Sequence, residues 1–416
     1  MIFVLLGAIQ AESFKLHVLF TNNIHGAIHE GPARFINPEF SPDLAGGAGA
    51  MSYVNTLRDE SKVDGDFVLL TDAGNIFQGT PLGTRDGGSN IIKWMNWLGY
   101  DALVPGVRDF DQGVKNLARL NEEAEFPFLA ANLKGVDGII PHKILEFGSI
   151  KIGLIGLITP FISDGLLPEN YEGVEISSLI ETLNDEVAEL KNQVDLVFVL
   201  CHLGIPYDRE IEYKKFIKKI NEGESIEIKN AIELAHFTES VDMIITGGFS
   251  KGYNTPWVDP NTHAIVVQNY GSLTGIGHLT LNIDQDKKVI KDYSFPTDRG
   301  MLVNLFTDDV WADKAMADTI KNWVNNAKKE EDLDYSDKIS SIGNNSCNMQ
   351  IKSTYSNYAI PKLGTNDNLE IMTWNMERFP LEGDKTMEAI AEIIQDLDVD
   401  IIGVQEVIKI GDLDKM

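Results

Sequence analysis

The chain has 416 residues, of which 43% are hydrophobic and 9% aromatic, so it can bury the core of a folded protein and is not a disordered chain. Its 63 acidic residues outnumber its 35 basic residues, which gives a formal net charge of −28. A charge of this sign excludes a general nucleic-acid-binding surface, because phosphate backbones are bound by basic patches.

The N-terminus, "MIFVLLGAIQAES", is a short apolar run that ends in "IQA". This pattern predicts a signal peptide over residues 1–12, and therefore a secreted or periplasmic protein. The run has no basic start, so an ordinary first strand is the alternative. It is too short to span a membrane, and no other stretch is long and apolar enough for a transmembrane helix. The two cysteines, Cys201 and Cys347, do not indicate a disulfide framework.

Between residues 13 and 300, apolar runs typical of strands alternate with segments of helical periodicity. In chain order the pattern predicts a strand at 15–22, a helix at 48–60, a strand at 66–74, a helix at 90–99, a strand at 101–106, a helix at 113–124, strands at 126–133 and 149–158, a helix at 179–194, a strand at 195–204, a helix at 228–240 and a strand at 241–248. Residues 263–271 and 275–284 are predicted to pair as antiparallel strands. This order indicates a layered α/β domain.

Residues 301–367 begin with a helix predicted at about 308–331 and continue as a segment rich in Ser, Asn, Gly and Asp, which is typical of a linker. The last block, 368–416, contains a predicted strand, an amphipathic helix at 385–397 and a buried strand at 399–407. A β-α-β unit of this size cannot easily bury its faces alone.

Five predicted strands of the first domain end in polar clusters: "TNNIHG", "TDAGNIFQGTP", "PGVRDFD", "LCHLG" and "ITGGFSKG". In open α/β folds, ligands and catalytic groups gather at the carboxyl ends of the strands. The sequence therefore predicts that these clusters meet at one edge of a sheet and form a site.

The order and spacing of the five clusters resemble the metallophosphatase domain of the 5′-nucleotidase family, which usually has T-N-D-x-H-G, D-A-G-D-x-x-Q-G, G-N-H-E-F-D, L-x-H-x-G and G-G-H-S-H. The resemblance covers residues 15–284 and includes "GYDALVPG" and "FPFLAANL". It implies the calcineurin-like metallophosphoesterase fold, a β-sandwich flanked by helices. It also implies a cofactor of two divalent metals of the zinc or manganese type, which clamp a phosphoryl group and activate water.

Transferred residue by residue, the family's metal-ligand positions fall on Asn23, His25, Asn75, Val107, His202, Phe249 and Lys251. Only His25 and His202 keep the usual residue type. The catalytic histidine is replaced by Arg108, while its partner aspartate is kept as Asp111.

These replacements weaken a two-metal site on chemical grounds. A neutral asparagine amide cannot replace a carboxylate that bridges two dications, and valine and phenylalanine side chains have no lone pair to donate. Arg108 and Lys251 place positive charges where metals would bind, which opposes metal loading. The sequence therefore predicts a 5′-nucleotidase-family phosphoesterase that is inactive or severely weakened.

Two alternatives stay open. In the first, the domain is a metal-independent module in which Arg108, Lys251 and Asn132 bind a small phosphorylated ligand such as a nucleotide. The competing interpretation of the two cations is that they only pair with Asp109 or Asp111. In the second, His25, His202 and an asparagine hold one metal in a weakly active phosphoesterase, although one-metal sites usually need three good ligands.

The tail resembles the opening of the endonuclease/exonuclease/phosphatase family, which has the DNase I-like fold. In "IMTWNMERF", Asn375 corresponds to the family's metal-linked asparagine, and in "VDIIGVQEV", Glu406 corresponds to its metal-binding glutamate. The family's later motifs do not occur before residue 416. The tail is therefore interpreted as a truncated fragment of such a domain, with a coincidental β-α-β unit as the alternative.

Overall fold

The computed structural model describes residues 13–33, 37, 39–341, 371–379, 390, 393–394 and 401–407; the side chains of Asp164, of residues 329–341 and of most of the tail are outside this description. The chain divides into two compact units, Met1–Ile339 and Ser340–Met416. Each unit is described by itself. The signal peptide predicted at 1–12 and the linker from residue 342 onward lie outside the described residues.

The first sheet of the larger unit has six strands in the order β15-β14-β1-β4-β5, with β16 pairing beside β14. Its strands are β1 (Ser13–Thr21), β4 (Phe67–Asp72), β5 (Ala102–Leu103), β14 (Gly275–Asp284), β15 (Val289–Ser294) and β16 (Leu302–Asn304). Strand β1 runs parallel to β4, and β4 runs parallel to β5, so the carboxyl ends of these three strands meet at one edge. Strand β14 pairs with the other side of β1 in antiparallel direction.

The second sheet also has six strands, in the order β12-β13-β11-β10-β8-β7. They are β7 (His142–Phe147), β8 (Ile150–Ile158), β10 (Leu196–His202), β11 (Met243–Thr246), β12 (Trp257–Val258) and β13 (Ile265–Gln268). Strands β8, β10, β11 and β13 are parallel. Apart from the exposed Lys151, β8 and β10 are buried along their length, as expected of strands covered on both faces.

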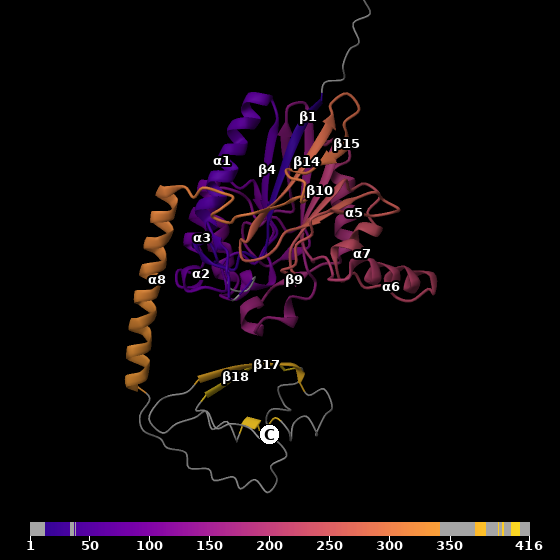
Figure 1. Ribbon diagram of the computed structural model, residues 1–416. Coiled ribbons are helices and arrows are strands. Elements are labelled where there is room, and N and C mark those ends of the chain that lie inside the picture. Colours follow the sequence, from indigo (N-terminus) through magenta and orange to yellow (C-terminus); the bar gives the residue numbers. More distant parts are fainter. Residues whose placement is uncertain are drawn as a thin grey trace, which may run out of the picture. The chain divides into compact units, whose positions relative to one another are not determined.

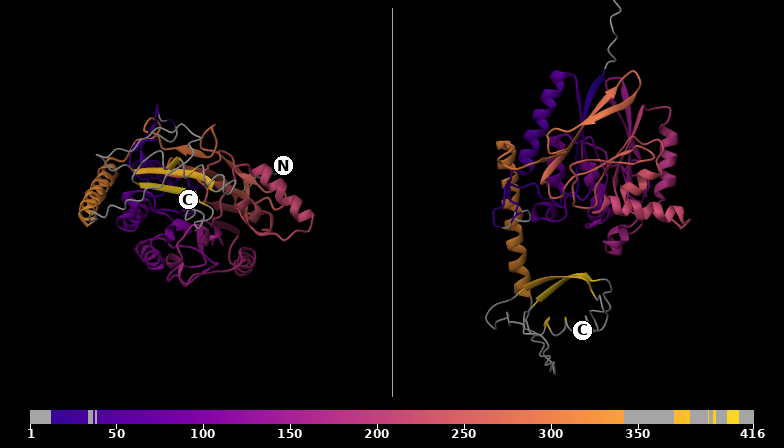
Figure 2. Two further views of the ribbon diagram at one scale, coloured as in Figure 1. Left: turned by 90° about the horizontal axis from the view of Figure 1, so that it is seen from below. Right: turned by 45° about the vertical axis from the view of Figure 1, so that its right-hand side comes forward.

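The two sheets pack face to face, and helices cover their outer faces. One apolar core contains side chains of both sheets, including Leu16 and Val18 of β1 with Phe198 and Leu200 of β10. Helices α1 (Gly46–Asp64), α3 (Ser89–Leu98) and α4 (Val114–Glu123) pack on the first sheet, and α5 (Leu179–Leu190), α6 (Arg209–Asn221) and α7 (Ala231–His236) on the second. Figures 1 and 2 show the indigo and the magenta helices on opposite sides of the strands. The predicted layered β-sandwich flanked by helices is confirmed.

Shorter elements connect these layers. They are β2 (Gly31–Pro32), β3 (Asp43–Leu44), α2 (Pro81–Thr84), the 3₁₀ turns η1 (Val107–Phe110), η2 (Ile162–Asp164) and η3 (Pro168–Tyr171), β6 (Leu133–Lys134) and β9 (Glu175–Ile176). Helix α8 (Lys314–Ser341) contacts α3, where Trp323 stacks on Trp97 with ring centroids 5.6 Å apart. No helix among the described residues has the length and apolar character to cross a membrane.

Two sequence expectations were wrong in detail. The segments at 263–271 and 275–284 are not an antiparallel pair, because β13 belongs to the second sheet and β14 to the first. A hydrophobic pattern shows that a strand is buried but does not identify its partner. Here β13 pairs with β11 and β12, and β14 pairs with β1, β15 and β16. The strand expected at 126–133 is instead an irregular segment with isolated bridges to Leu103 and Ile140, followed by the short strand β6.

In the smaller unit, β17 (Ile371–Phe379) pairs in parallel with β18 (Ile401–Val407). Helical residues occur between them at Ile390 and at 393–394. Asn375 is opposite Gln405, the residue before Glu406. The side chains of Asn375 and Glu406 are outside the described part of the chain.

Candidate functional site

The polar loops predicted to meet do lie together at the carboxyl ends of the strands of both sheets. The backbone N–H of Asn23, after β1, donates to the carbonyl of Gly74, after β4, over 2.8 Å. His202, at the end of β10, contacts the carbonyl of Ala73. The amide of Asn23 also donates to Ser250, in the loop after β11, over 3.3 Å. We call this group of loops the cleft.

Three loops of the cleft are joined by a chain of amide hydrogen bonds. The Nδ2 of Asn75 donates to the Oδ1 of Asn23 over 3.2 Å, and the Oδ1 of Asn75 accepts from the backbone N–H of Arg108 over 2.8 Å. Both asparagine side chains are buried. A hydrogen bond between two amides needs an N–H₂ on one side, so two ionised carboxylates could not form this contact.

The backbone of the cleft loops is bent at these same positions. Asn23, His25 and Asn75 have φ angles of 50°, 53° and 64°, which is the left-handed region that asparagine and histidine tolerate better than most residues. Gly106 allows the loops to approach, because a Cβ there would collide with the side chains of Asn75 and His202. Such conformations concentrate at functional sites.

Two buried carboxylates hold the cleft loops from beneath. Asp109 accepts hydrogen bonds from the backbone N–H groups of Asn75, Ile76 and Gly106, each within 2.7 to 2.8 Å. Asp72 accepts from Thr21 and from the N–H of Gly74. Burial raises the pKa of Asp109 to about 6 and that of Asp72 to about 7. Asp109 therefore organises the loops, a role that its position in "VRDFD" did not reveal.

The two histidines of the cleft are each fixed through one ring nitrogen. The Nδ1 of His25 donates to the carbonyl of Gln78 over 2.9 Å, and the Nδ1 of His202 donates to that of Ala73 over 2.5 Å. These contacts leave each Nε2 as the acceptor, without a partner among the described residues. Burial lowers the pKa of both rings, that of His202 to about 4, and the neighbouring charge of Arg108 lowers the pKa of His25 further.

Arg108 takes the place of the catalytic histidine of the resembling family. Of the two carboxylates that could pair with it, Asp109 and Asp111, only Asp111 does so. Its guanidinium Nη1 donates to the carbonyl of Gly165 over 3.1 Å and lies 3.6 Å from the carboxylate of Asp111. Asp109 makes no ion pair with it, because both oxygens of Asp109 already accept backbone N–H groups. The side chain of Arg108 is 50% exposed, so the pair with Asp111 is worth little stability.

A cavity of about 290 Å³ lies within the cleft. Its lining includes five residues from the sequence argument or its neighbours: Asn75, Val107, Arg108, His202 and Phe249. It also includes Leu203 and Gly248, which belong to the motifs "LCHLG" and "ITGGFSKG", and three residues that the sequence argument missed: Thr159, Phe161 and Lys229. Thr159 and Phe161 follow β8, which carries none of the five polar motifs. Lys229 precedes α7 and had no motif to mark it.

Two predicted phosphate-binding residues do not line this cavity. The Nζ of Lys251 donates to the carbonyl of Tyr207 over 2.8 Å and lies over the rings of Tyr207 and Tyr253, 4.9 and 5.1 Å from their centroids. Asn132 is fully buried, and its amide bonds both the N–H and the carbonyl of Ile158. Its polar atoms therefore tie the chain after β5 to the end of β8.

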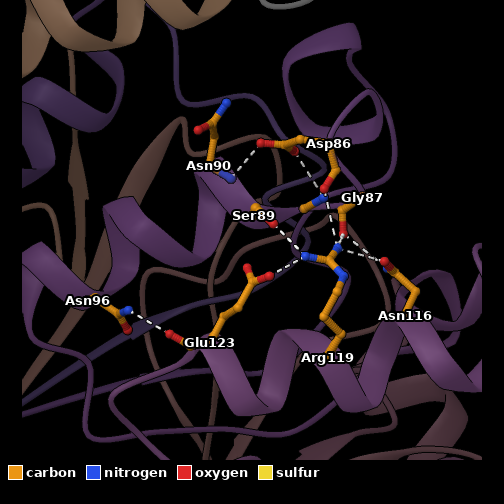
Figure 3. Close-up of polar contacts among 9 residues, drawn as sticks. Asp86, Gly87, Ser89, Asn90, Asn96, Asn116, Arg119 and Glu123 are labelled. Carbon is orange, nitrogen blue, oxygen red and sulfur yellow. Dashed lines mark hydrogen bonds and ion pairs between the residues drawn. The ribbon is translucent and has the colours of Figure 1, made fainter.

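The turn that carries Val107 and Arg108 is supported by α4. Arg119 of α4 donates to the carbonyls of Asp86 and Gly87 over 3.2 and 3.0 Å and to the hydroxyl of Ser89 over 2.5 Å (Figure 3). Gln112, at the start of this segment, donates to the carbonyl of Thr84. These bonds attach the segment after η1 to the loop before α3.

Comparison with known proteins gives the family context of this geometry. The chain matches no protein-family profile. It is 28% identical over 341 residues to a snake venom 5′-nucleotidase from Gloydius brevicauda, across 78% of this chain and 54% of the relative. It is 32% identical over 220 residues to the human 5′-nucleotidase, across 49% of this chain and 36% of the relative. The chain thus spans about half the length, or less, of these relatives.

Solved structures share the fold. The calcineurin-like phosphoesterase YfkN from Bacillus subtilis aligns with a TM-score of 0.59 at 22% identity, over 77% of this chain and 99% of that one. The 5′-nucleotidase precursor from Thermus thermophilus aligns with a TM-score of 0.58 at 21% identity, over 77% of this chain and 59% of that one. The chain is related to the 5′-nucleotidases. The sequence relatives and the shared calcineurin-like metallophosphoesterase fold both support this relationship.

Proposed function

We propose that the first unit is a 5′-nucleotidase-related phosphoesterase domain that no longer carries out two-metal phosphoryl hydrolysis. The observation that carries this proposal is the hydrogen bond between the amides of Asn23 and Asn75, continued to the N–H of Arg108. The resemblance expects carboxylates at the first two positions. In this chain the two side chains satisfy one another.

The donors present do not fit a pair of divalent metals. His25 and His202 each offer one neutral ring nitrogen, while Val107 and Phe249 offer none. Among the described residues, no three His, Cys, Asp or Glu side chains are grouped closely enough to hold a metal ion. A two-metal phosphoesterase needs a bridging carboxylate and further charged ligands, and the guanidinium of Arg108 repels a cation. We therefore derive no catalytic step through metals for this chain.

The experiment is a phosphoesterase panel on the purified full chain. We expect no turnover of p-nitrophenyl phosphate, bis-p-nitrophenyl phosphate or AMP, with or without added Mn²⁺ or Zn²⁺. Turnover that requires one of these metals and disappears with EDTA would contradict the proposal. It would favour the one-metal alternative at His25 and His202, whose rings are close enough for the charge of His25 to lower the pKa of His202.

A restored variant provides the matched positive control. It combines Asn23→Asp, Asn75→Asp, Val107→Asn, Arg108→His, Phe249→His and Lys251→His. Metal-dependent activity in this variant but not in the wild-type chain would support loss of the ligands as the cause. An inactive variant that binds two metals would instead place the cause outside these six positions.

The remaining sequence predictions extend this proposal. We propose an exported protein, because residues 1–12 resemble a signal peptide and a relative is named as a venom protein. N-terminal sequencing of the secreted product, beginning near residue 13, would test this. For the tail, we propose the start of a DNase I-like domain in which Asn375 and Glu406 belong to a metal site. The parallel pairing of β17 and β18 supports a β-α-β unit, and a longer reading frame would test the assignment.

A further inference from the structure

We propose that the cavity in the cleft binds a small phosphate monoester without metal, through Arg108 and Lys229. Phe161 and Phe249 would contact its organic group. This inference rests on the proposed function, because two bound dications would compete with the guanidinium of Arg108. The inference states which class of ligand the altered cleft still binds. The second cation that contacts this ligand is Lys229, and not Lys251 as the sequence suggested.

The charge of the cavity lining is opposite to that of the chain. Acidic residues outnumber basic ones by 63 to 35 in the whole sequence, yet the lining contains two cationic side chains and no Asp or Glu. A concave surface lined by one sign of charge concentrates ions of the other sign. An anion is therefore the ligand that this lining favours.

Both cations have donors to spare. The Nη1 of Arg108 makes its contacts with Gly165 and Asp111, while its Nε and Nη2 have no partner among the described residues. Arginine presents its donors as a planar fork that matches two oxygens of a phosphate. The Nζ of Lys229 has no hydrogen bond or ion pair among the described residues, and only its backbone N–H is used, by Glu233.

The neutral polar groups of the lining favour a phosphate ester over other oxyanions. The hydroxyl of Thr159 accepts from the N–H of Phe161 over 3.3 Å, so its hydrogen is free to donate to an anion. The Nε2 of His202 is an acceptor, because Nδ1 donates to Ala73. Below its second pKa of about 6, a phosphate monoester carries a hydroxyl that can donate to this nitrogen. A sulfate monoester has no such hydroxyl.

The apolar part of the lining indicates that the anion carries an organic group. Phe161, Phe249, Val107 and Leu203 contribute to the wall. Phe249 is 40% exposed, and its ring stands edge-on to Tyr207 with centroids 6.4 Å apart. An exposed aromatic ring beside cationic groups suits a planar substituent that can stack on it. The volume of about 290 Å³ lies just below the usual range of ligand pockets, roughly 300–1,000 Å³, which favours a small ligand.

The experiment is isothermal titration calorimetry of the full chain in EDTA with three probes: phenyl phosphate, inorganic phosphate and phenyl sulfate. We expect saturable binding of phenyl phosphate, several-fold tighter than that of inorganic phosphate and tighter than that of phenyl sulfate. Arg108→Gln and Lys229→Gln should each lower the affinity for phenyl phosphate about tenfold or more, because each variant loses one charge-assisted hydrogen bond. Phe249→Ala should lower the affinity for phenyl phosphate but leave the affinity for inorganic phosphate unchanged.

Two control variants remove a positive charge outside the lining. Lys219→Gln lies on α6, and Lys251→Gln removes the cation that points to Tyr207; both should bind phenyl phosphate like the wild-type chain. No saturable binding at millimolar phenyl phosphate, unchanged binding by Arg108→Gln and Lys229→Gln, or equal affinity for phenyl sulfate would each overturn the inference. Thermal unfolding of each variant would identify losses caused by misfolding. Metal-dependent hydrolysis of the same probe would instead overturn the proposed function.

Discussion

Two pairs of histidines in the first unit differ in how their ring nitrogens are used. His17 and His278, which we call the sheet histidines, share a 2.9 Å contact, and Tyr53 of α1 lies 2.6 Å from the other nitrogen of His278. The second nitrogen of His17 lies 3.9 Å from Asp66. In the cleft, His25 and His202 each use only one nitrogen. Partners on every nitrogen indicate a structural role, whereas a spare nitrogen on a fixed ring indicates a site for a ligand.

The largest effect expected is on the support of the cleft. Asp109→Ala removes the acceptor of three buried N–H groups, and each unsatisfied group costs about 1–3 kcal/mol. We expect the free energy of unfolding to fall by about 3–5 kcal/mol in urea titrations. Asp111→Ala, which loses only a half-exposed ion pair, should cost less than about 1 kcal/mol. Equal effects of the two variants would mean that Asp109 does not hold the loops.

A pH titration of stability sharpens the structural side of the comparison. Burial lowers the pKa of His278 from 6.5 to about 3, so between these values the unfolded chain binds a proton that the folded chain does not. Its contribution is complete above pH 6.5 and is lost as the pH falls. We expect the stability advantage of the wild-type chain over His278→Gln to shrink by roughly 2–3 kcal/mol from about pH 6.5 to about pH 4.5.

The difference in stability between the wild-type chain and His278→Gln isolates the contribution of His278. Asp72 and Asp109, whose raised pKa values act in the opposite direction, are present in both. Urea titrations at each pH would measure the difference. A gap that stays constant over this range would show that His278 is not held neutral by its surroundings.

A smaller loss of stability is expected when Arg119, which lies farther from the cleft, is replaced. Arg119→Ala removes the bonds to the loop of Asp86 and Gly87, and its side chain is 37% exposed. We expect a loss of about 1–2 kcal/mol. Glu123→Gln keeps those bonds and weakens only the exposed pair with Arg119, so it should cost no more than about 0.5 kcal/mol. A larger loss in Glu123→Gln would assign the stability to the ion pair.

Much of the fold and part of the site could be predicted from the sequence, because both depend on local patterns. Buried strands that end in polar clusters indicated the parallel strands and the meeting of their loops. The sheet partners of β13 and β14 could not be predicted, because a hydrophobic run does not determine which strand lies beside it. Lys229 and Phe161 reach the cavity only through tertiary packing. The position of Lys251 in a motif does not fix the direction of its side chain, which points to the carbonyl of Tyr207.

The central claim, that the cleft has lost its two-metal site, is tested most directly by the metal content of the wild-type chain. Purified protein would be equilibrated with Mn²⁺ or Zn²⁺, dialysed free of unbound metal and measured by elemental analysis. The account predicts fewer than two metal ions per chain and, because the cleft holds none of them, no change in the measured value for Asn75→Ala. Two ions per chain, reduced by Asn75→Ala, would contradict it.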